Sequence, residues 1–160
     1  MAWRGSTTVK DRIFACLPYL LPLVSALPFG GFLFRQFPAL EAMLKIPLTP
    51  VLFVYQVLGS WGGIIIFFLL FLLVVRNERI VHFIRFNAMQ AILLDILLVL
   101  CSLLFNILLK GLGTNLVTET LLNIVFLGTV AACGYSIVQS LLGRYAEIPA
   151  LSEAVYAQVP

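Results

Sequence analysis

The chain has 160 residues, of which 62% are hydrophobic and 11% are charged, and its formal net charge is +3. A soluble domain is nearer half apolar and a quarter charged, and a disordered chain has few apolar residues and many charges, so the composition excludes both. The small net charge also lacks the basic footprint of a nucleic-acid-binding protein. We therefore predict an all-α integral membrane protein that forms a single polytopic domain over residues 1–160.

Four apolar stretches divide the sequence. They cover residues 13–34, 51–75, 88–109 and 120–142. Each is long enough to cross about 30 Å of hydrocarbon as a helix, which takes about 20 residues. Asp95 is the one charged side chain inside these stretches. The sequence therefore predicts four transmembrane helices joined by short connections.

The basic residues favour one orientation in the membrane. One side would carry Arg4, Lys10, Arg12, Arg76, Arg79, Arg85 and Arg144. The other side would carry only Arg35, Lys45 and Lys110. Because the side with more Lys and Arg faces the cytoplasm, we predict that both termini and the second loop are cytoplasmic, or stromal in a plastid.

The first stretch is rich in proline. Pro18, Pro22 and Pro28 lie within it, and Gly30 and Gly31 follow. Each internal proline removes a backbone hydrogen bond and clashes with the preceding turn. Two interpretations remain open: a kinked helix packed against its neighbours, or a broken helix that lines a polar pathway, as in transporters.

The first loop has an amphipathic pattern. Pro38 is suited to begin a short helix, and Pro47 is suited to end it. Leu40, Met43 and Leu44 would share one face of that helix. We expect this helix to lie flat on the outer membrane interface.

The second loop has a similar pattern. Asn77 is a plausible N-cap for an interfacial helix that begins at Glu78. Arg79, His82 and Arg85 would then face lipid head groups or water. The arginines of this loop could also bind anionic lipid.

Asp95 stands out because a carboxyl group is costly inside a membrane. It would lie about 10 Å deep if the third span begins at residue 88, and we expect it to face the bundle interior, either protonated or paired. At 100° per residue, Ser102 and Asn106 fall within about 40° of it. The candidate polar pathway or partner seam consists of Arg85, Asn87, Gln90, Asp95, Ser102 and Asn106. Both interpretations remain open: a hydrogen-bonded seam between helices, or a hydrated pathway.

Two faces carry small residues at the spacing that lets helices approach closely. Gly59 and Gly63 form one face in the second span, and Gly128, Ala132 and Ser136 form another in the fourth. These faces would serve helix packing either within the chain or between subunits.

Catalytic and metal-binding patterns are absent from the sequence. His82 is the only histidine, and no nucleophile-elbow, P-loop or dinucleotide motif occurs. The three cysteines, Cys16, Cys101 and Cys133, lie inside predicted spans without a disulfide or metal-site spacing. We therefore predict a protein that is not an enzyme and has no cofactor or metal.

The segment from His82 to Ile96 reads HFIRFNAMQAILLDI, and LPYL and LPFG occur in the first span. These motifs and the four-span plan resemble the twenty-kilodalton Tic subunit family of chloroplast inner-envelope proteins, which has homologues in cyanobacteria and algal plastid genomes. The resemblance implies a subunit of the protein-import machinery, for which a channel-forming role has been proposed, and it brings no catalytic residues.

The resemblance also implies a location and partners. The N-terminal segment MAWRGSTTVKDR is too short and polar for a transit peptide, so we expect a cyanobacterial or plastid-encoded member. Its membrane would be the cyanobacterial plasma or thylakoid membrane, or the plastid inner envelope. Expected partners are membrane lipids, other translocon subunits or further copies of the chain, and transiting polypeptides, with no nucleic acid.

We therefore favour a component of a protein translocation machinery that acts as an oligomer or beside other subunits, because four spans make a poor wide pore. Two alternatives are a small-solute or ion carrier that uses Asp95 and the first span, and a structural or assembly subunit of a bacterial membrane complex.

Overall fold

The computed structural model describes residues 6–159, and within them the secondary structure is entirely helical. Four helical runs are long and apolar enough to cross a membrane: Val9–Gln36, Pro38–Val75, His82–Leu112 and Leu116–Leu141. The all-α, four-span prediction is therefore confirmed. Arg4, which contributed to the predicted orientation, lies outside the described residues.

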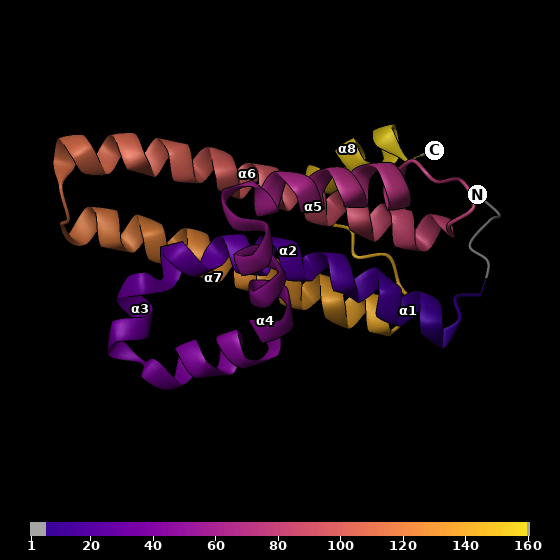
Figure 1. Ribbon diagram of the computed structural model, residues 1–160, viewed down its shortest axis with the longest axis horizontal. Coiled ribbons are helices and arrows are strands. Elements are labelled where there is room, and N and C mark those ends of the chain that lie inside the picture. The colour runs from indigo at the N-terminus through magenta and orange to yellow at the C-terminus, as the bar shows by residue number, and fades with distance from the viewer. Residues whose placement is uncertain (1–5, 160) are drawn as a thin grey trace.

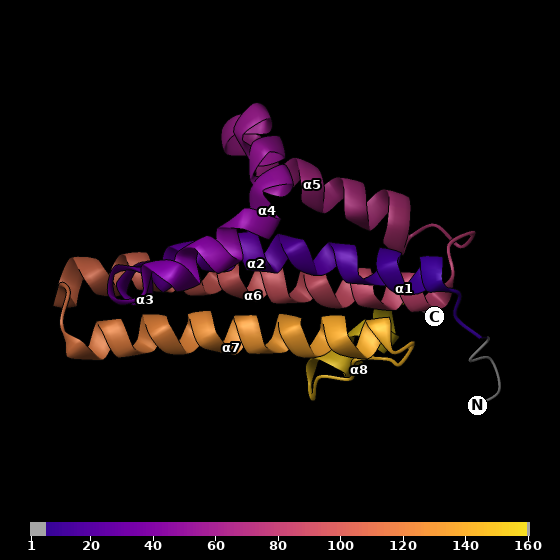
Figure 2. The same ribbon diagram turned by 90° about the horizontal axis from the view of Figure 1, so that it is seen from below.

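The third and fourth spans form the long antiparallel pair of the bundle. They are α6 (His82–Leu112) and α7 (Leu116–Leu141), and the first span packs along both of them (Figures 1 and 2). The N-terminal segment, the C-terminal segment and the loop before α6 lie at one end, while the α6–α7 turn lies at the other (Figure 1). We call these the inner and outer ends, following the orientation that the basic residues predict.

The first span is a kinked but continuous helical run. It consists of α1 (Val9–Cys16), η1 (Leu17–Tyr19), α2 (Leu20–Ala26), η2 (Leu27–Gly30) and α3 (Gly31–Gln36). Pro18 and Pro28 each occupy one of the first positions of a 3₁₀ turn, where the missing backbone N–H costs least. Tyr19, Leu21 and Ala26 are buried against the other spans. The structure therefore has the kinked, packed helix.

The separate interfacial helix expected in the first loop is wrong, because the helix that begins at Pro38 does not end at Pro47 and continues into the second span. The helix α4 runs over Pro38–Leu58 with Pro47 and Pro50 inside it, because internal prolines bend a helix without ending it when the turns on both sides persist. The break comes at Gly59, whose φ of 62° is favourable only for glycine.

Beyond the break, the chain continues as η3 (Gly59–Trp61), α5 (Gly62–Leu70) and the π-helical turn η4 (Phe71–Val75). In Figure 2, α4 stands away from the bundle, whereas α5 runs back along it. Only 6% of the most apolar window of this span is buried. The second span is therefore the least packed of the four.

The predicted interfacial helix from Glu78 is wrong. Residues 76–81 form turns, and α6 begins at His82. Asn77 does not cap a helix, because its Oδ1 accepts a hydrogen bond from the Arg79 backbone N–H at 3.0 Å. Such a side-chain turn competes with helix formation. Arg85, expected to face lipid head groups or water, is buried in the first turn of α6, as is Phe83.

A C-terminal helix that the sequence did not indicate folds back onto the inner end. This helix, α8 (Leu151–Gln158), follows Ala150, whose φ is 68°. Val155 and Val159 are 0% and 1% exposed and pack in one apolar cluster with Phe86 of α6. The C-terminal segment thus packs against the inner part of α6.

Candidate functional site

A cluster of polar side chains is buried in the inner half of the bundle. Asn87 and Gln90 of α6 are both 0% exposed. The Tyr19 hydroxyl of the first span donates to Asn87 Oδ1 at 2.8 Å, and Gln90 Nε2 donates to the same hydroxyl at 2.9 Å. From the fourth span, the Ser140 hydroxyl donates to Asn87 Oδ1 at 2.9 Å. The cluster therefore ties the first, third and fourth spans together.

The same cluster holds the C-terminal segment. Gln90 Nε2 donates to the Ala146 carbonyl at 2.8 Å, beyond the end of α7, and Asn87 Nδ2 donates to the Phe83 carbonyl at 2.8 Å within its own helix. Gln90 Oε1 is buried without a partner. Because these bonds connect protein groups that are shielded from solvent, the cluster is a buried hydrogen-bonded network between helices.

Arg85 and His82 make further links at the inner end. Arg85 Nε donates to the Val75 carbonyl at 2.8 Å, at the end of the second span. This corrects the expectation that Arg85 faces lipid head groups, because the side chain is 9% exposed and bonded to protein. The His82 ring contacts the Tyr145 hydroxyl at 3.0 Å and the Val159 carbonyl at 3.2 Å, and so it holds the C-terminal segment.

Asp95 lies about two turns beyond Asn87 on α6. It faces the bundle interior, as predicted. It is 7% exposed, and its Oδ1 atom is buried without a hydrogen-bond partner. The Ser25 hydroxyl of α2 adjoins the carboxyl group. Tyr55 of α4 and Cys133 of α7 lie within electrostatic range of it.

The two outermost members of the predicted stripe are separated from the rest. Ser102 and Asn106 are exposed, and Asn106 Nδ2 bonds only to the Ser102 carbonyl of its own helix at 2.9 Å. With Arg35 of α3 they line a cavity of about 320 Å³ near the outer end. The stripe is therefore split into a buried inner part and an exposed outer part that borders this cavity.

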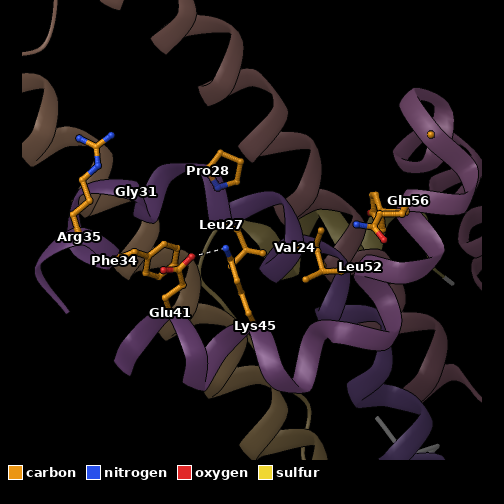
Figure 3. Close-up of a pocket in the computed structure, with 12 residues that line it drawn as sticks. Val24, Leu27, Pro28, Gly31, Phe34, Arg35, Glu41, Lys45, Leu52 and Gln56 are labelled. Carbon is orange, nitrogen blue, oxygen red and sulfur yellow. Dashed lines mark hydrogen bonds and ion pairs between the residues drawn. The ribbon is translucent and has the colours of Figure 1, made fainter. Parts of the chain in front are cut away.

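A larger cavity, which we call the outer cavity, lies between the first span and α4 (Figure 3). Its volume is about 870 Å³. The walls include the apolar residues Val24, Leu27, Phe34 and Leu52. The polar residues that line it are Arg35, Glu41, Lys45, Tyr55 and Gln56.

The charges in the outer cavity are partly neutralised. Glu41 and Lys45 form an ion pair one turn apart on α4. Arg35 points away from this pair (Figure 3), and its guanidinium group lies 5.7 Å from the centre of the Phe32 ring. This site could not be predicted from the sequence, because its residues come from two spans that meet only in the folded chain. The pair Tyr55-Gln56 inside an apolar stretch was the available signal.

The glycines of the two predicted packing faces meet few atoms of the rest of the chain. A Cβ atom built on Gly59 or Gly128 meets nothing within 4 Å, and one built on Gly63 meets only Tyr55 of the same span. Ala132 does pack beside the cluster of Tyr19 and Cys133. Contact between subunits at the glycine positions stays a prediction.

Groups of three or more His, Cys, Asp or Glu side chains that could hold a metal ion are not found among residues 6–159. The three cysteines are free thiols. The arrangement therefore consists of a buried polar cluster in the inner half, one buried carboxyl group with an unpartnered oxygen, and a partly polar cavity in the outer half.

Comparisons with known proteins identify relatives over nearly the whole chain. Residues 8–155 match the family described as chloroplast import apparatus Tic20-like. A Tic20 family protein of Synechocystis sp. is 51% identical over 161 residues, which cover 99% of both chains. Protein TIC 20-II, chloroplastic, of Arabidopsis thaliana is 35% identical, with 96% of this chain and 74% of that protein aligned. A Tic20 family protein of Gracilaria tenuistipitata is also 35% identical, over 95% of this chain and 76% of its own length.

Proposed function

This chain belongs to the Tic20 family, and from that membership we propose that it is a membrane-embedded component of a protein translocation machinery. It is a multi-pass membrane protein of the cyanobacterial or plastid envelope. The family is described as an import apparatus, which is not a class of enzymes. We infer that the chain works by binding and positioning polypeptide and not by catalysis.

The outer cavity carries this proposal. A helix about 10 Å wide with a pitch of 5.4 Å occupies roughly 400 Å³ per turn, so a cavity of about 870 Å³ matches roughly two turns of polypeptide. Its apolar walls suit the side chains of an amphipathic segment. Its polar residues offer hydrogen bonds that lipid cannot give to a polypeptide backbone.

The buried polar cluster of the inner half favours an assembly over a pore through one chain. None of the cluster residues Tyr19, Asn87, Gln90 and Ser140 lines the outer cavity. We therefore propose that the chain contributes one wall of a conduit, which other subunits or further copies complete. The sparsely packed second span and the unoccupied face at Gly59 are the surfaces we assign to these partners.

Site-specific crosslinking during translocation tests the proposal. A photoreactive side chain at Gln56, which lines the outer cavity, should crosslink to a polypeptide arrested in the membrane. The matched control is Val57, which is the next residue of α4, is 70% exposed and does not line the cavity. Equal crosslinking from both positions, or none from Gln56, contradicts the proposal.

A small-ion carrier is the second candidate function, because Asp95 is a buried carboxylate without a partner on Oδ1. In proteoliposomes, Asp95→Asn should abolish proton- or ion-coupled flux if the chain is a carrier. Flux that is absent from the native chain, or unchanged in the variant, excludes this alternative.

A further inference from the structure

Two polar atoms on helices that both pack against α2 are buried without partners. One is Asp95 Oδ1 on α6, and the other is the Tyr55 hydroxyl on α4. An unsatisfied carboxylate oxygen in an apolar environment is costly, more so than a neutral group. Asp95 Oδ1 therefore lacks a donor in this structure, although the Ser25 hydroxyl adjoins the carboxyl group.

The carboxyl group does not line the outer cavity, but two of its neighbours connect it to the cavity wall. Val24 and Tyr55 line that cavity from α2 and α4. Ser25, the next residue after Val24, adjoins Asp95, and Tyr55 lies within its electrostatic range. Tyr55 is thus a side chain that both lines the cavity and lies near Asp95, and it belongs to the least packed span.

The cavity presents a second carboxylate nearer its outer side. Glu41 is held by Lys45 on the same helix, and the side chains of Lys45 and Glu41 are 47% and 38% exposed. An exposed pair of this kind is weak and exchanges readily. Arg35, the remaining cation, is turned away toward Phe32 (Figure 3).

We propose that Asp95 is the anionic end of a site for a guanidinium or ammonium group that enters through the outer cavity, with Glu41 as a first contact and Tyr55 as the side chain that moves aside. Such a group brings N–H donors to Oδ1 and neutralises a charge inside the membrane. The inference rests on the proposed function for the natural source of the cation, which is a basic side chain of a transiting polypeptide. Chloroplast targeting segments are rich in arginine and poor in acidic residues, so they carry the matching chemistry.

Two peptides that differ only in charge test this site. The full chain in nanodiscs is titrated with a fluorescent amphipathic peptide that contains arginines, and with the same peptide carrying neutral citrulline at those positions. The native chain should bind the arginine peptide more tightly. Asp95→Asn should weaken that binding by about tenfold, because loss of one partner of a buried charge pair is costly, and it should leave citrulline-peptide binding unchanged.

The matched control is Glu119→Gln, which removes a carboxylate from the first turn of α7 outside the cavity. It should bind both peptides as the native chain does. Glu41→Gln, at a more exposed position, should slow association of the arginine peptide by a few-fold, since rim charges act mainly on the association rate. This second variant keeps the test decisive if Asp95→Asn does not fold.

Three results would overturn the inference or part of it. If the native chain binds both peptides with equal affinity, it has no cation site. If the Asp95→Asn variant still prefers the arginine peptide, Asp95 is not part of that site. Displacement of the peptide by free arginine amide at similar concentration assigns the site to a small organic cation and contradicts the polypeptide source. If the cation site is absent but the translocation function is right, Gln56 should still crosslink to the arrested polypeptide. If the translocation function is wrong but the cation site is right, that crosslink should be lost, and the chain should still prefer the arginine peptide.

Discussion

The Tyr19 hydroxyl donates a 2.8 Å hydrogen bond to Asn87 Oδ1 across 68 residues of sequence. Both side chains are fully buried. Tyr19 belongs to the LPYL motif of the first span, and Asn87 belongs to the RFNAMQA motif of the third. Two of the motifs that carry the family resemblance are therefore in direct contact, and what they form is a structural joint at the inner end.

Removing that hydroxyl should destabilise the bundle. Tyr19→Phe keeps the ring but removes the donor to Asn87 and the acceptor for Gln90. We expect a loss of about 1 kcal/mol in unfolding free energy, in the range of hydrogen bonds between membrane helices. Denaturant unfolding of the detergent-solubilised chain measures it. Tyr135→Phe, at a position 46% exposed on α7, should change nothing.

Two adjacent glycines in the first span should differ in how alanine substitution changes the stability of the chain. A Cβ atom on Gly30 would lie 2.7 Å from Phe34 and 2.8 Å from Phe126, whereas one on Gly31 meets nothing within 4 Å. Gly30→Ala should therefore cost about 1–3 kcal/mol through overpacking, while Gly31→Ala should be neutral or slightly stabilising. Thermal denaturation of the two variants side by side decides this. Similar melting temperatures would contradict the packing at Gly30.

Arg85 should not tolerate lysine. Its Nε atom donates to the Val75 carbonyl, and lysine lacks the planar group that fixes this geometry. Arg85→Lys should lower the unfolding free energy by about 1–2 kcal/mol and increase proteolysis in the 76–81 loop. Arg79→Lys, at an exposed position in that loop, is the control. Unchanged proteolysis in Arg85→Lys would show that the contact does not hold the two spans together.

His82 should anchor the C-terminal helix. A carbonyl only accepts hydrogen bonds, so Nε2 carries the proton toward Val159 and Nδ1 accepts from the Tyr145 hydroxyl. His82→Ala removes both contacts, and faster hydrogen exchange should follow in α8 while α7 stays protected. Glu78→Ala, in the exposed preceding turn, should leave α8 protected. Equal exchange in the two variants would rule out the anchor.

The predicted orientation can be tested by labelling. In a chain whose native cysteines are replaced, a cysteine at Arg35 or Lys110 should react with an impermeant reagent from the outer side only. The reason is the excess of basic residues at the opposite end. Labelling of either position from the cytoplasmic side would reverse the assignment.

The sequence predicts the spans well because each apolar stretch is long enough to specify a transmembrane helix by itself. The interior position of Asp95 is predictable for a similar reason, because an ionisable side chain that faced lipid would be costly. Pro47 and Gly59 show where such local reasoning fails. A proline can bend a helix or end it, and only the surrounding contacts decide which.

The candidate site is harder to predict because it depends on which helices meet. Ser102 and Asn106 share a helical face with Asp95, yet they border a cavity and stay exposed while Asp95 is buried. Asn77 has the chemistry of a helix cap, but its side chain bonds to the turn instead. The helix α8 depends on burial of Val155 and Val159 against α6, and its short sequence carries no strong signal of its own.

The bend at Gly59 also has a consequence for the lipid around the protein. The second span has 38 residues from Pro38 to Val75, which would extend about 57 Å as a straight helix, well beyond the roughly 30 Å of hydrocarbon. After the bend, the 9 residues of α5 and the 5 of η4 extend only about 21 Å. A bilayer adjusts to a short helix by becoming thinner beside it. The membrane next to α5 should therefore be locally thin, which shortens the apolar distance that a hydrophilic segment has to cross there.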